Sequence, residues 1–188
     1  MSTEHTTKEY SIFQIAINLM IACFVAGLII GVTNFVTSPI AIKNAADKEM
    51  KTMQALVPDA DTFTPIDGKT DWYAATKGGE KIAYVVPGET KGYGGAITML
   101  VAVKTTGEVI NFSILKANET PGLGDNAGKE PFKSQFAGKT SENLVVTKDP
   151  SNKENIQAMT GATISSKAVT KGVKEAVDEV VAFAGGNK

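Results

Sequence analysis

The sequence contains no arginine, one cysteine and one histidine. Its 19 basic residues are all lysines, and 20 acidic residues oppose them, so the formal net charge is −1. Nucleic-acid-binding proteins usually carry a basic surplus and use arginine for bidentate contacts to phosphate and guanine. This balance argues against a nucleic-acid partner. A single cysteine and a single histidine also exclude a disulfide framework and a Cys/His metal site, so we expect no metal ligands.

A cysteine–histidine catalytic pair is excluded by position. Cys23 lies in a long apolar run, whereas His5 lies in the polar N-terminal tail. The sequence offers no other residue that we nominate as a catalytic acid, base or nucleophile. Without arginine, any bound phosphate must be held by backbone N–H groups, hydroxyls, lysines or a covalent bond.

A long uncharged segment lies near the N-terminus. No Asp, Glu, Lys or Arg occurs from Tyr10 to Ile42, and residues 12–36 are predominantly apolar. Twenty-five residues in a helix extend about 37 Å, enough to cross a hydrocarbon core of about 30 Å. A cleaved signal peptide is the alternative, but this run is longer than a typical h-region and no clean A-x-A cleavage site follows it. We therefore expect one uncleaved transmembrane helix.

Charge does not settle the orientation of this helix. Lys8 precedes it, whereas Lys43, Lys48 and Lys51 follow it, so the positive-inside rule mildly favours a cytoplasmic domain. The spacing of its small residues, with Gly27 four positions before Gly31, suits packing against another membrane helix but equally suits lipid contact.

The chain divides into four expected segments. These are an N-terminal tail at 1–11, the transmembrane helix at 12–36, a stalk helix at 37–58 and a folded domain at 59–188. Ser38-Pro39 marks the exit from the membrane, and Pro58 ends the helical spacing of apolar residues that follows. A core helix of the domain is an equally good interpretation of this second helical segment.

The remaining pattern predicts an α+β domain. Strand-like runs lie at 83–86, 96–103, 109–115 and 143–147; helical segments lie at 131–136 and 165–184. Residues 104–108 have a length that suits a hairpin between two of these strands. We expect a twisted, mainly antiparallel sheet with an amphipathic C-terminal helix packed on it, while the region 59–71 is rich in turn residues.

The most informative motif, Thr-Gly-Ala-Thr-Ile-Ser-Ser, occupies residues 160–166 at the start of the predicted C-terminal helix. A helix N-terminus presents unpaired N–H groups and a dipole that favours an anion, so hydroxyl side chains here suit phosphate binding. An ordinary N-cap by Thr163, Ser165 or Ser166 is the alternative.

Two glycine-rich loops accompany this motif. Residues 90–95 read Thr-Lys-Gly-Tyr-Gly-Gly, and residues 118–126 read Asn-Glu-Thr-Pro-Gly-Leu-Gly-Asp-Asn. Glycine lets a backbone approach a flat ligand closely, and Pro121 stiffens its turn. Plain turns at the ends of strands are the alternative interpretation.

Together, the motifs Gly-Tyr-Gly-Gly, Glu-Thr-Pro-Gly-Leu-Gly-Asp and Thr-Gly-Ala-Thr-x-Ser-Ser, behind one membrane helix, resemble the FMN-binding G subunit of Rnf-type ion-translocating electron-transport complexes. The related C subunit of sodium-translocating NADH:quinone reductases shares the last motif. The resemblance implies an FMN-binding domain whose FMN is joined through a phosphoester bond to Thr163. It also implies a separate flavin transferase that takes FMN from FAD with Mg²⁺, outside the cytoplasmic membrane. One departure is Gln157, at a position where the target of the transferase often has Asp.

The resemblance, taken with the local chemistry, gives a set of expected cofactor-binding residues. Those around the phosphate are Thr160, Gly161, Ala162, Thr163, Ser165 and Ser166; those bordering the isoalloxazine ring are Gly94, Gly95, Glu119, Thr120, Pro121, Gly122, Leu123 and Gly124. Ser165 and Ser166 can supply hydroxyl donors to the phosphodiester. As possible acids or bases, Glu119 and Asp125 are better interpreted as solvated turn residues.

The resemblance therefore predicts an electron-carrier subunit of an ion-translocating ferredoxin:NAD oxidoreductase, with no turnover by this chain alone. It implies a single-pass protein of the cytoplasmic membrane whose FMN domain lies on the extracytoplasmic face, surrounded by lipid and by other subunits of the complex. Three alternatives remain. Two of them keep the flavin: a C-type subunit of a sodium-translocating NADH:quinone reductase, and a stand-alone membrane-tethered flavoprotein of another respiratory chain. The third is a membrane-anchored scaffold without a cofactor.

Overall fold

The computed structural model describes residues 11–186. Almost all of the tail at 1–11, including His5 and Lys8, lies outside these residues, as do the last two residues of the predicted domain. The chain forms two compact units, residues 1–48 and residues 49–188, and each is described by itself.

Helix α1 (Ile12–Leu56) supplies the described part of the first unit. Its portion Ile12–Ala41 is long and apolar enough to cross a membrane. Thr33 donates its hydroxyl proton to the carbonyl of Ile29 at 2.8 Å, so this polar group is satisfied within the helix. The helix continues through Pro39, where the sequence suggested a boundary. A proline removes one helical hydrogen bond, but the turns on either side can still propagate the helix.

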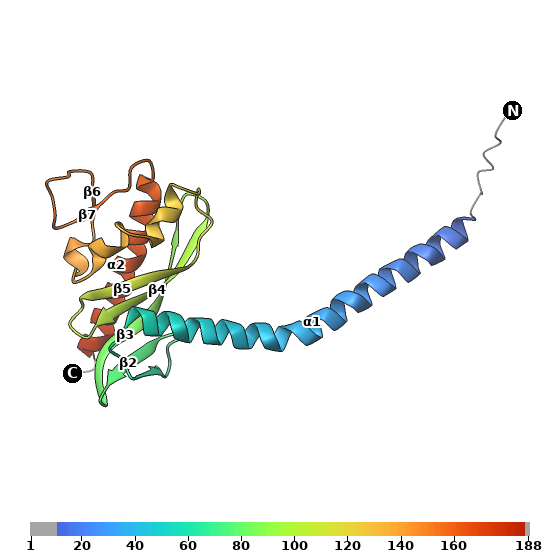
Figure 1. The fold of residues 1–188 in the computed structure, drawn as a ribbon, viewed down its shortest axis with the longest axis horizontal. Coiled ribbons are helices and arrows are strands. Elements are labelled where there is room, and N and C mark those ends of the chain that lie inside the picture. The colour runs from blue at the N-terminus through green and yellow to red at the C-terminus, as the bar shows by residue number, and fades with distance from the viewer. Residues whose placement is uncertain (1–10, 187–188) are drawn as a thin grey trace. The chain divides into compact units, whose positions relative to one another are not determined.

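The second unit is built on a five-stranded sheet with strands in sequence order (Figure 1). Its strands are β1 (Thr62–Pro65), β2 (Tyr73–Lys77), β3 (Glu80–Lys91), β4 (Ala96–Lys104) and β5 (Val109–Lys116). Every neighbouring pair is antiparallel, which confirms the predicted α+β class. Strands β1 and β2 were not predicted from the sequence, because they are short and lie among Asp, Gly and Pro residues.

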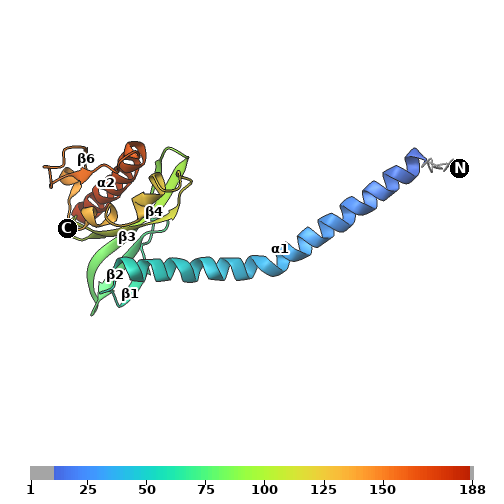
Figure 2. The ribbon, with the colours of Figure 1, turned by 45° about the horizontal axis from the view of Figure 1, so that its top comes forward.

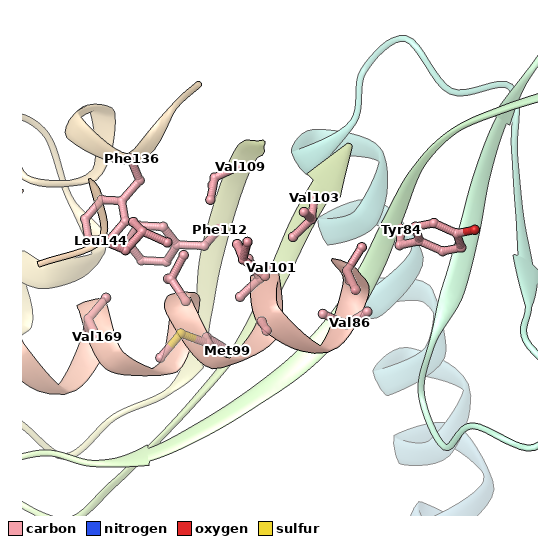
Figure 3. Close-up of a cluster of buried hydrophobic side chains, with 14 of the residues drawn as sticks. Tyr84, Val86, Met99, Val101, Val103, Val109, Phe112, Phe136, Leu144 and Val169 are labelled. Atoms are coloured by element: carbon pink, nitrogen blue, oxygen red, sulfur yellow. The ribbon is translucent and has the colours of Figure 1, made fainter. Parts of the chain in front are cut away.

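Helix α2 (Thr163–Gly186) covers one face of this sheet (Figure 2). Residues of β4 alternate between the two faces, since successive side chains of a strand point in opposite directions. Met99 and Val101 point toward α2 and pack beside Val169 and Phe112 in one continuous apolar core, drawn in Figure 3. This packing fixes the line of α2, and with it the position of its first turn.

The opposite face of the sheet packs against the end of α1. Met53 and Leu56 are almost completely buried, and they contact a cluster that includes Val85 and Leu100. The final turns of α1 therefore belong to the second unit, which begins at Glu49. From the sequence, the segment at 37–58 could be either a stalk helix or a core helix of the domain. In the structure its C-terminal end contributes core residues.

Short elements connect the sheet to α2. These are the 3₁₀ helices η1 (Gly124–Gly128), η2 (Lys133–Phe136) and η3 (Ser141–Asn143), and the strands β6 (Val146–Thr147) and β7 (Ile156–Gln157). Strands β6 and β7 pair in parallel. A further bond, from Ala158 N–H to the Thr147 carbonyl at 2.9 Å, carries this pairing toward the start of α2.

Candidate functional site

The start of α2 presents open hydrogen-bond donors. Gly161 adopts a φ of 76°, a left-handed conformation that suits glycine, and turns the chain into the helix. In the described part of the chain, no backbone carbonyl accepts from the N–H groups of Thr163, Ile164 or Ser165. The first intrahelical bond runs from Ser166 N–H to the Ala162 carbonyl at 3.0 Å. These open N–H groups and the helix dipole favour an anion at this end of α2.

Ser166 holds the turn that precedes the helix. Its side chain is completely buried; Oγ accepts the N–H of Met159 at 3.0 Å and donates to the carbonyl of Ala162 at 2.9 Å. We call Met159, Ala162 and Ser166 the Ser166 turn. A hydroxyl has one proton, and here the backbone uses it. In this structure Ser166 therefore shapes the helix start and offers no donor toward a ligand.

Glu119 joins three segments that are distant in sequence. One carboxylate oxygen accepts the N–H of Gly94 at 2.9 Å, and the other accepts the hydroxyl of Ser165 in a very short hydrogen bond. We call Gly94, Glu119 and Ser165 the Glu119 cluster. Glu119 is thus a half-buried link between both glycine loops and α2, and its interpretation as a solvated turn residue was wrong. Ser165 also uses its only proton in this cluster.

Two glycines make this close approach possible. A Cβ at Gly94 would overlap the carbonyl oxygen of Asn118. A Cβ at Gly124 would lie 2.5 Å from Ser165 Oγ and 2.6 Å from a carboxylate oxygen of Glu119. Both positions exclude a side chain unless their neighbours move, which gives the glycine-rich loops a physical reason beyond turn formation.

A surface cavity of about 740 Å³ lies beside these clusters. It is lined by Tyr93, Thr120, Leu123, Gly124, Lys148, Gly161, Ala162, Thr163, Ile164 and Ser165. The three large apolar side chains of this lining are exposed, with Tyr93 at 71%, Leu123 at 44% and Ile164 at 56% of their full accessibility. The cavity thus combines an apolar rim with the open donors of the helix start.

The structure separates the residues expected at the cofactor into four groups. Thr120, Leu123, Gly124, Gly161, Ala162, Thr163 and Ser165 line the cavity. Thr160 instead lines a neighbouring cavity of about 490 Å³. Gly94 and Glu119 do not line the cavity, but Glu119 binds both Gly94 and the lining residue Ser165 in the Glu119 cluster. Ser166 holds the turn that precedes α2. Gly95, Pro121 and Gly122 are not among the residues that line the larger cavity.

Thr163 combines the properties that a modification site requires. It is the first residue of α2, it is partly exposed, and it lines the cavity. Within residues 11–186, no hydrogen bond involves its hydroxyl. Among the three hydroxyl residues at positions 163, 165 and 166, only Thr163 therefore has its hydroxyl proton available for other chemistry.

The cavity has one charged lining residue, Lys148. Asp125 lies in the second glycine loop, but Lys129 lies 2.8 Å from its carboxylate. The hydrogen bond from Lys129 holds the pKa of Asp125 below its usual value, so this negative charge is already compensated. Tyr93, Lys148 and Ile164 are not among the site residues predicted from the sequence. Tyr93 and Ile164 lie inside the motifs already identified, so the sequence offered a signal for them. Lys148 lies at the cavity because β6 pairs with β7, and no local motif indicates that pairing.

Gln157, the departure from the family pattern, has a structural role here. Its side-chain amide donates to the carbonyls of Asp149 at 2.7 Å and Asn152 at 2.5 Å. Its own N–H donates to the side chain of Gln135 at 2.7 Å. A carboxylate has no proton to donate to those two carbonyls, so an aspartate in this position could not hold the 149–152 loop in the same way.

The donor set of the site is not that of a metal centre. Among the residues that the structure describes, no group of three or more His, Cys, Asp and Glu side chains could hold a metal ion. The cavity supplies N–H groups, the hydroxyls of Tyr93, Thr120 and Thr163, and one ammonium, which are groups that recognise an anionic ligand.

Comparison with known proteins agrees with this anion-binding character. Residues 92–178 match the family model described as an FMN-binding domain. The chain is 58% identical to the G subunit of the proton-translocating ferredoxin:NAD(+) oxidoreductase complex of Clostridium ljungdahlii, over 95% of this chain and 96% of that protein. It is 32% identical to the G subunit of the Na(+)-translocating ferredoxin:NAD(+) oxidoreductase complex of Acetobacterium woodii, over 88% of this chain and 90% of that protein.

A solved structure shares the fold. The C subunit of the Na(+)-translocating NADH-quinone reductase from Parabacteroides distasonis matches with a TM-score of 0.51 and 22% identity, over 60% of this chain and 61% of that chain. The fold, the FMN-binding domain match and the near-complete alignment to G subunits agree with one another. The chain belongs to the family of G subunits of ion-translocating ferredoxin:NAD(+) oxidoreductase complexes.

Proposed function

We propose that this chain is a membrane-anchored electron carrier in an ion-translocating ferredoxin:NAD oxidoreductase complex, and that its FMN is bound covalently to Thr163. The observation that carries the proposal is the free hydroxyl of Thr163 at the N-terminus of α2, in the wall of a cavity. The family membership supports the complex, and the FMN-binding domain match supports the cofactor.

The cavity fits FMN in size and in chemistry. Ligand cavities of roughly 300–1,000 Å³ are typical for small molecules and cofactors, and this one has about 740 Å³. The exposed Tyr93, Leu123 and Ile164 offer apolar surface to the flat ring. The N–H groups of Thr163, Ile164 and Ser165 suit the phosphate.

Attachment requires a group transfer with FAD as co-substrate. The oxygen of Thr163 forms a bond to the phosphorus of the FMN moiety, the pyrophosphate bond of FAD breaks, and AMP leaves. The hydroxyl proton of Thr163 is released to a base supplied by the flavin transferase or by water. The product is a phosphodiester with one negative charge, which the helix N-terminus stabilises without arginine.

Bound FMN supplies the one- and two-electron chemistry, and the chain supplies placement. A covalent bond retains the cofactor at any dilution, which suits a domain on the extracytoplasmic face. Residues 12–36 then cross the membrane, 37–58 connect the membrane to the domain, and the flanking membrane subunits exchange electrons with the FMN. The C-type quinone reductase is the less favoured alternative, since its likeness is limited to the fold.

The test is co-expression of the full chain with a flavin transferase, followed by denaturing electrophoresis and in-gel fluorescence. The wild-type band is expected to fluoresce, and Thr163→Ala is expected to lose the signal at equal protein level. Ser151→Ala is a matched control in an exposed loop outside the cavity. A fluorescent Thr163→Ala band would contradict the attachment site, and a dark wild-type band would contradict covalent FMN. Co-purification with NADH-oxidising subunits and protease digestion from outside sealed cells test the complex and the orientation.

A further inference from the structure

We propose that the ammonium of Lys148 is the ionic partner of the phosphodiester on Thr163. This inference rests on the proposed function, because it requires a phosphodiester at that position. Lys148 is the one charged residue among those that line the cavity, and it shares this lining with Thr163. An anionic ligand bound in this cavity therefore has a single cationic side chain in its wall.

The backbone places Lys148 beside the helix start. Lys148 directly follows β6, which pairs in parallel with β7. The bond from Ala158 N–H to the Thr147 carbonyl, at 2.9 Å, fixes the residue before Lys148 next to the chain that enters the Thr160–Ala162 turn. Two hydrogen-bonded strands, rather than a free loop, thus hold the base of the lysine against the segment that carries Thr163.

The charge of Lys148 is uncompensated in this structure. In the described part of the chain, no hydrogen bond or ion pair involves its ammonium. Three other lysines, by contrast, are engaged: Lys129 pairs with Asp125, and Lys139 and Lys174 donate to backbone carbonyls. Lys148 is exposed and can swing its long stem toward an anion at little cost.

Both serine hydroxyls in the first turn of α2 are already committed. Ser165 donates to Glu119, and Ser166 donates to the Ala162 carbonyl. The cavity then offers the phosphodiester neutral donors, which are the open N–H groups of the first turn and the hydroxyls of Tyr93 and Thr120, and one cationic donor, the ammonium of Lys148. The N–H groups fix its position, and the ammonium compensates its charge.

The first test is lysine footprinting of the full chain in detergent with N-hydroxysuccinimidyl acetate. Wild-type protein loaded by the transferase is compared with wild-type protein made without it, after in-gel fluorescence has confirmed loading. Acetylation of Lys148 is expected to slow about threefold on loading, the factor that an exposed ion pair produces. The control is Lys153, which lies outside the cavity lining and should react equally in both forms.

Salt separates an ion pair from simple coverage by the ring. Raising NaCl from about 0.1 M to about 1 M shortens the Debye length from about 10 Å to about 3 Å, so protection by an ion pair should largely disappear. Equal acetylation of Lys148 in both forms at low salt would overturn the proposal. So would protection that persists at high salt. A dark wild-type band would instead show that the proposed function has failed.

A second measurement uses the ³¹P resonance of the phosphodiester in loaded protein. Lys148→Met, which removes the charge and keeps a long stem, is expected to shift this resonance. Lys148→Arg should restore it toward the wild-type position, and Lys153→Met should leave it unchanged. A Lys148→Met resonance that coincides with wild type would overturn the pairing, whatever the stability of the variant.

Discussion

The Glu119 cluster and the Ser166 turn hold the start of α2 by different means. In the Glu119 cluster, a charged acceptor joins residues that are 25 and 46 positions apart. In the Ser166 turn, a neutral hydroxyl joins backbone groups only seven and four positions away. Hydrogen bonds to a charged group contribute about 1.5–3 kcal/mol, against about 1 kcal/mol for a neutral pair. The long-range side of the site therefore depends on one carboxylate, whereas the local side is built into the motif.

The largest expected effect comes from closing the space within the Glu119 cluster. In Gly94→Val, the new side chain overlaps the Asn118 carbonyl oxygen, so the two glycine loops must separate. We expect a loss of about 3 kcal/mol in the free energy of unfolding, the upper part of the range for overpacking, and little flavin loading. Chemical unfolding and in-gel fluorescence measure the two quantities. Gly185→Ala, where a Cβ meets nothing within 4 Å, is the control. Wild-type loading by Gly94→Val would contradict the importance of this contact.

Removing the carboxylate itself is expected to have the next largest effect. Glu119→Ala leaves the N–H of Gly94 and the hydroxyl of Ser165 without their acceptor, and should lower stability by about 2 kcal/mol and slow flavin loading. The double variant with Ser165→Ala measures the coupling between the two side chains, which we expect to be about 1 kcal/mol. Strictly additive effects would show that the Glu119–Ser165 bond contributes nothing.

Ser166→Ala tests the local side of the site. The N–H of the partly buried Met159 loses its acceptor, which should cost about 1–2 kcal/mol. Because the three open N–H groups of α2 remain, we expect loading per folded molecule to fall less than in Glu119→Ala. The comparison divides the flavin loading of each variant, from in-gel fluorescence, by its folded fraction, from chemical unfolding. A greater loss of flavin loading in Ser166→Ala than in Glu119→Ala would contradict the greater importance of the Glu119 cluster.

The smallest expected effect concerns Asp125, in the second glycine loop. Its pKa is lowered in the folded protein by the hydrogen bond from Lys129, so its stabilisation is present above the unfolded pKa of about 3.9 and is lost as the pH falls further. Asp125→Asn should therefore slightly flatten the decline in stability between about pH 5 and pH 3. Unfolding curves across this range measure the slope. A slope identical to wild type would show that the pair does not stabilise the fold.

The same contrast explains what could be predicted from the sequence. The hairpin at 104–108, the apolar strands and the C-terminal helix follow from local periodicity and turn chemistry, so the sequence alone predicts them. The role of Glu119 and the place of Lys148 depend on pairings between distant segments, which a local pattern does not contain. The sequence also suggested a helix boundary at Pro39, because proline often ends a helix. In the structure α1 continues through Pro39, since one lost hydrogen bond does not end a long helix.

The most direct test of the account is to locate the flavin by peptide mapping of loaded wild-type protein. Cleavage after lysine releases residues 154–167, which contain Thr160, Thr163, Ser165 and Ser166. The account predicts that this peptide carries FMN with loss of one water, and that fragmentation assigns the added mass to Thr163. An FMN adduct on Thr160 or Ser165, or full loading without any modified peptide, would contradict it.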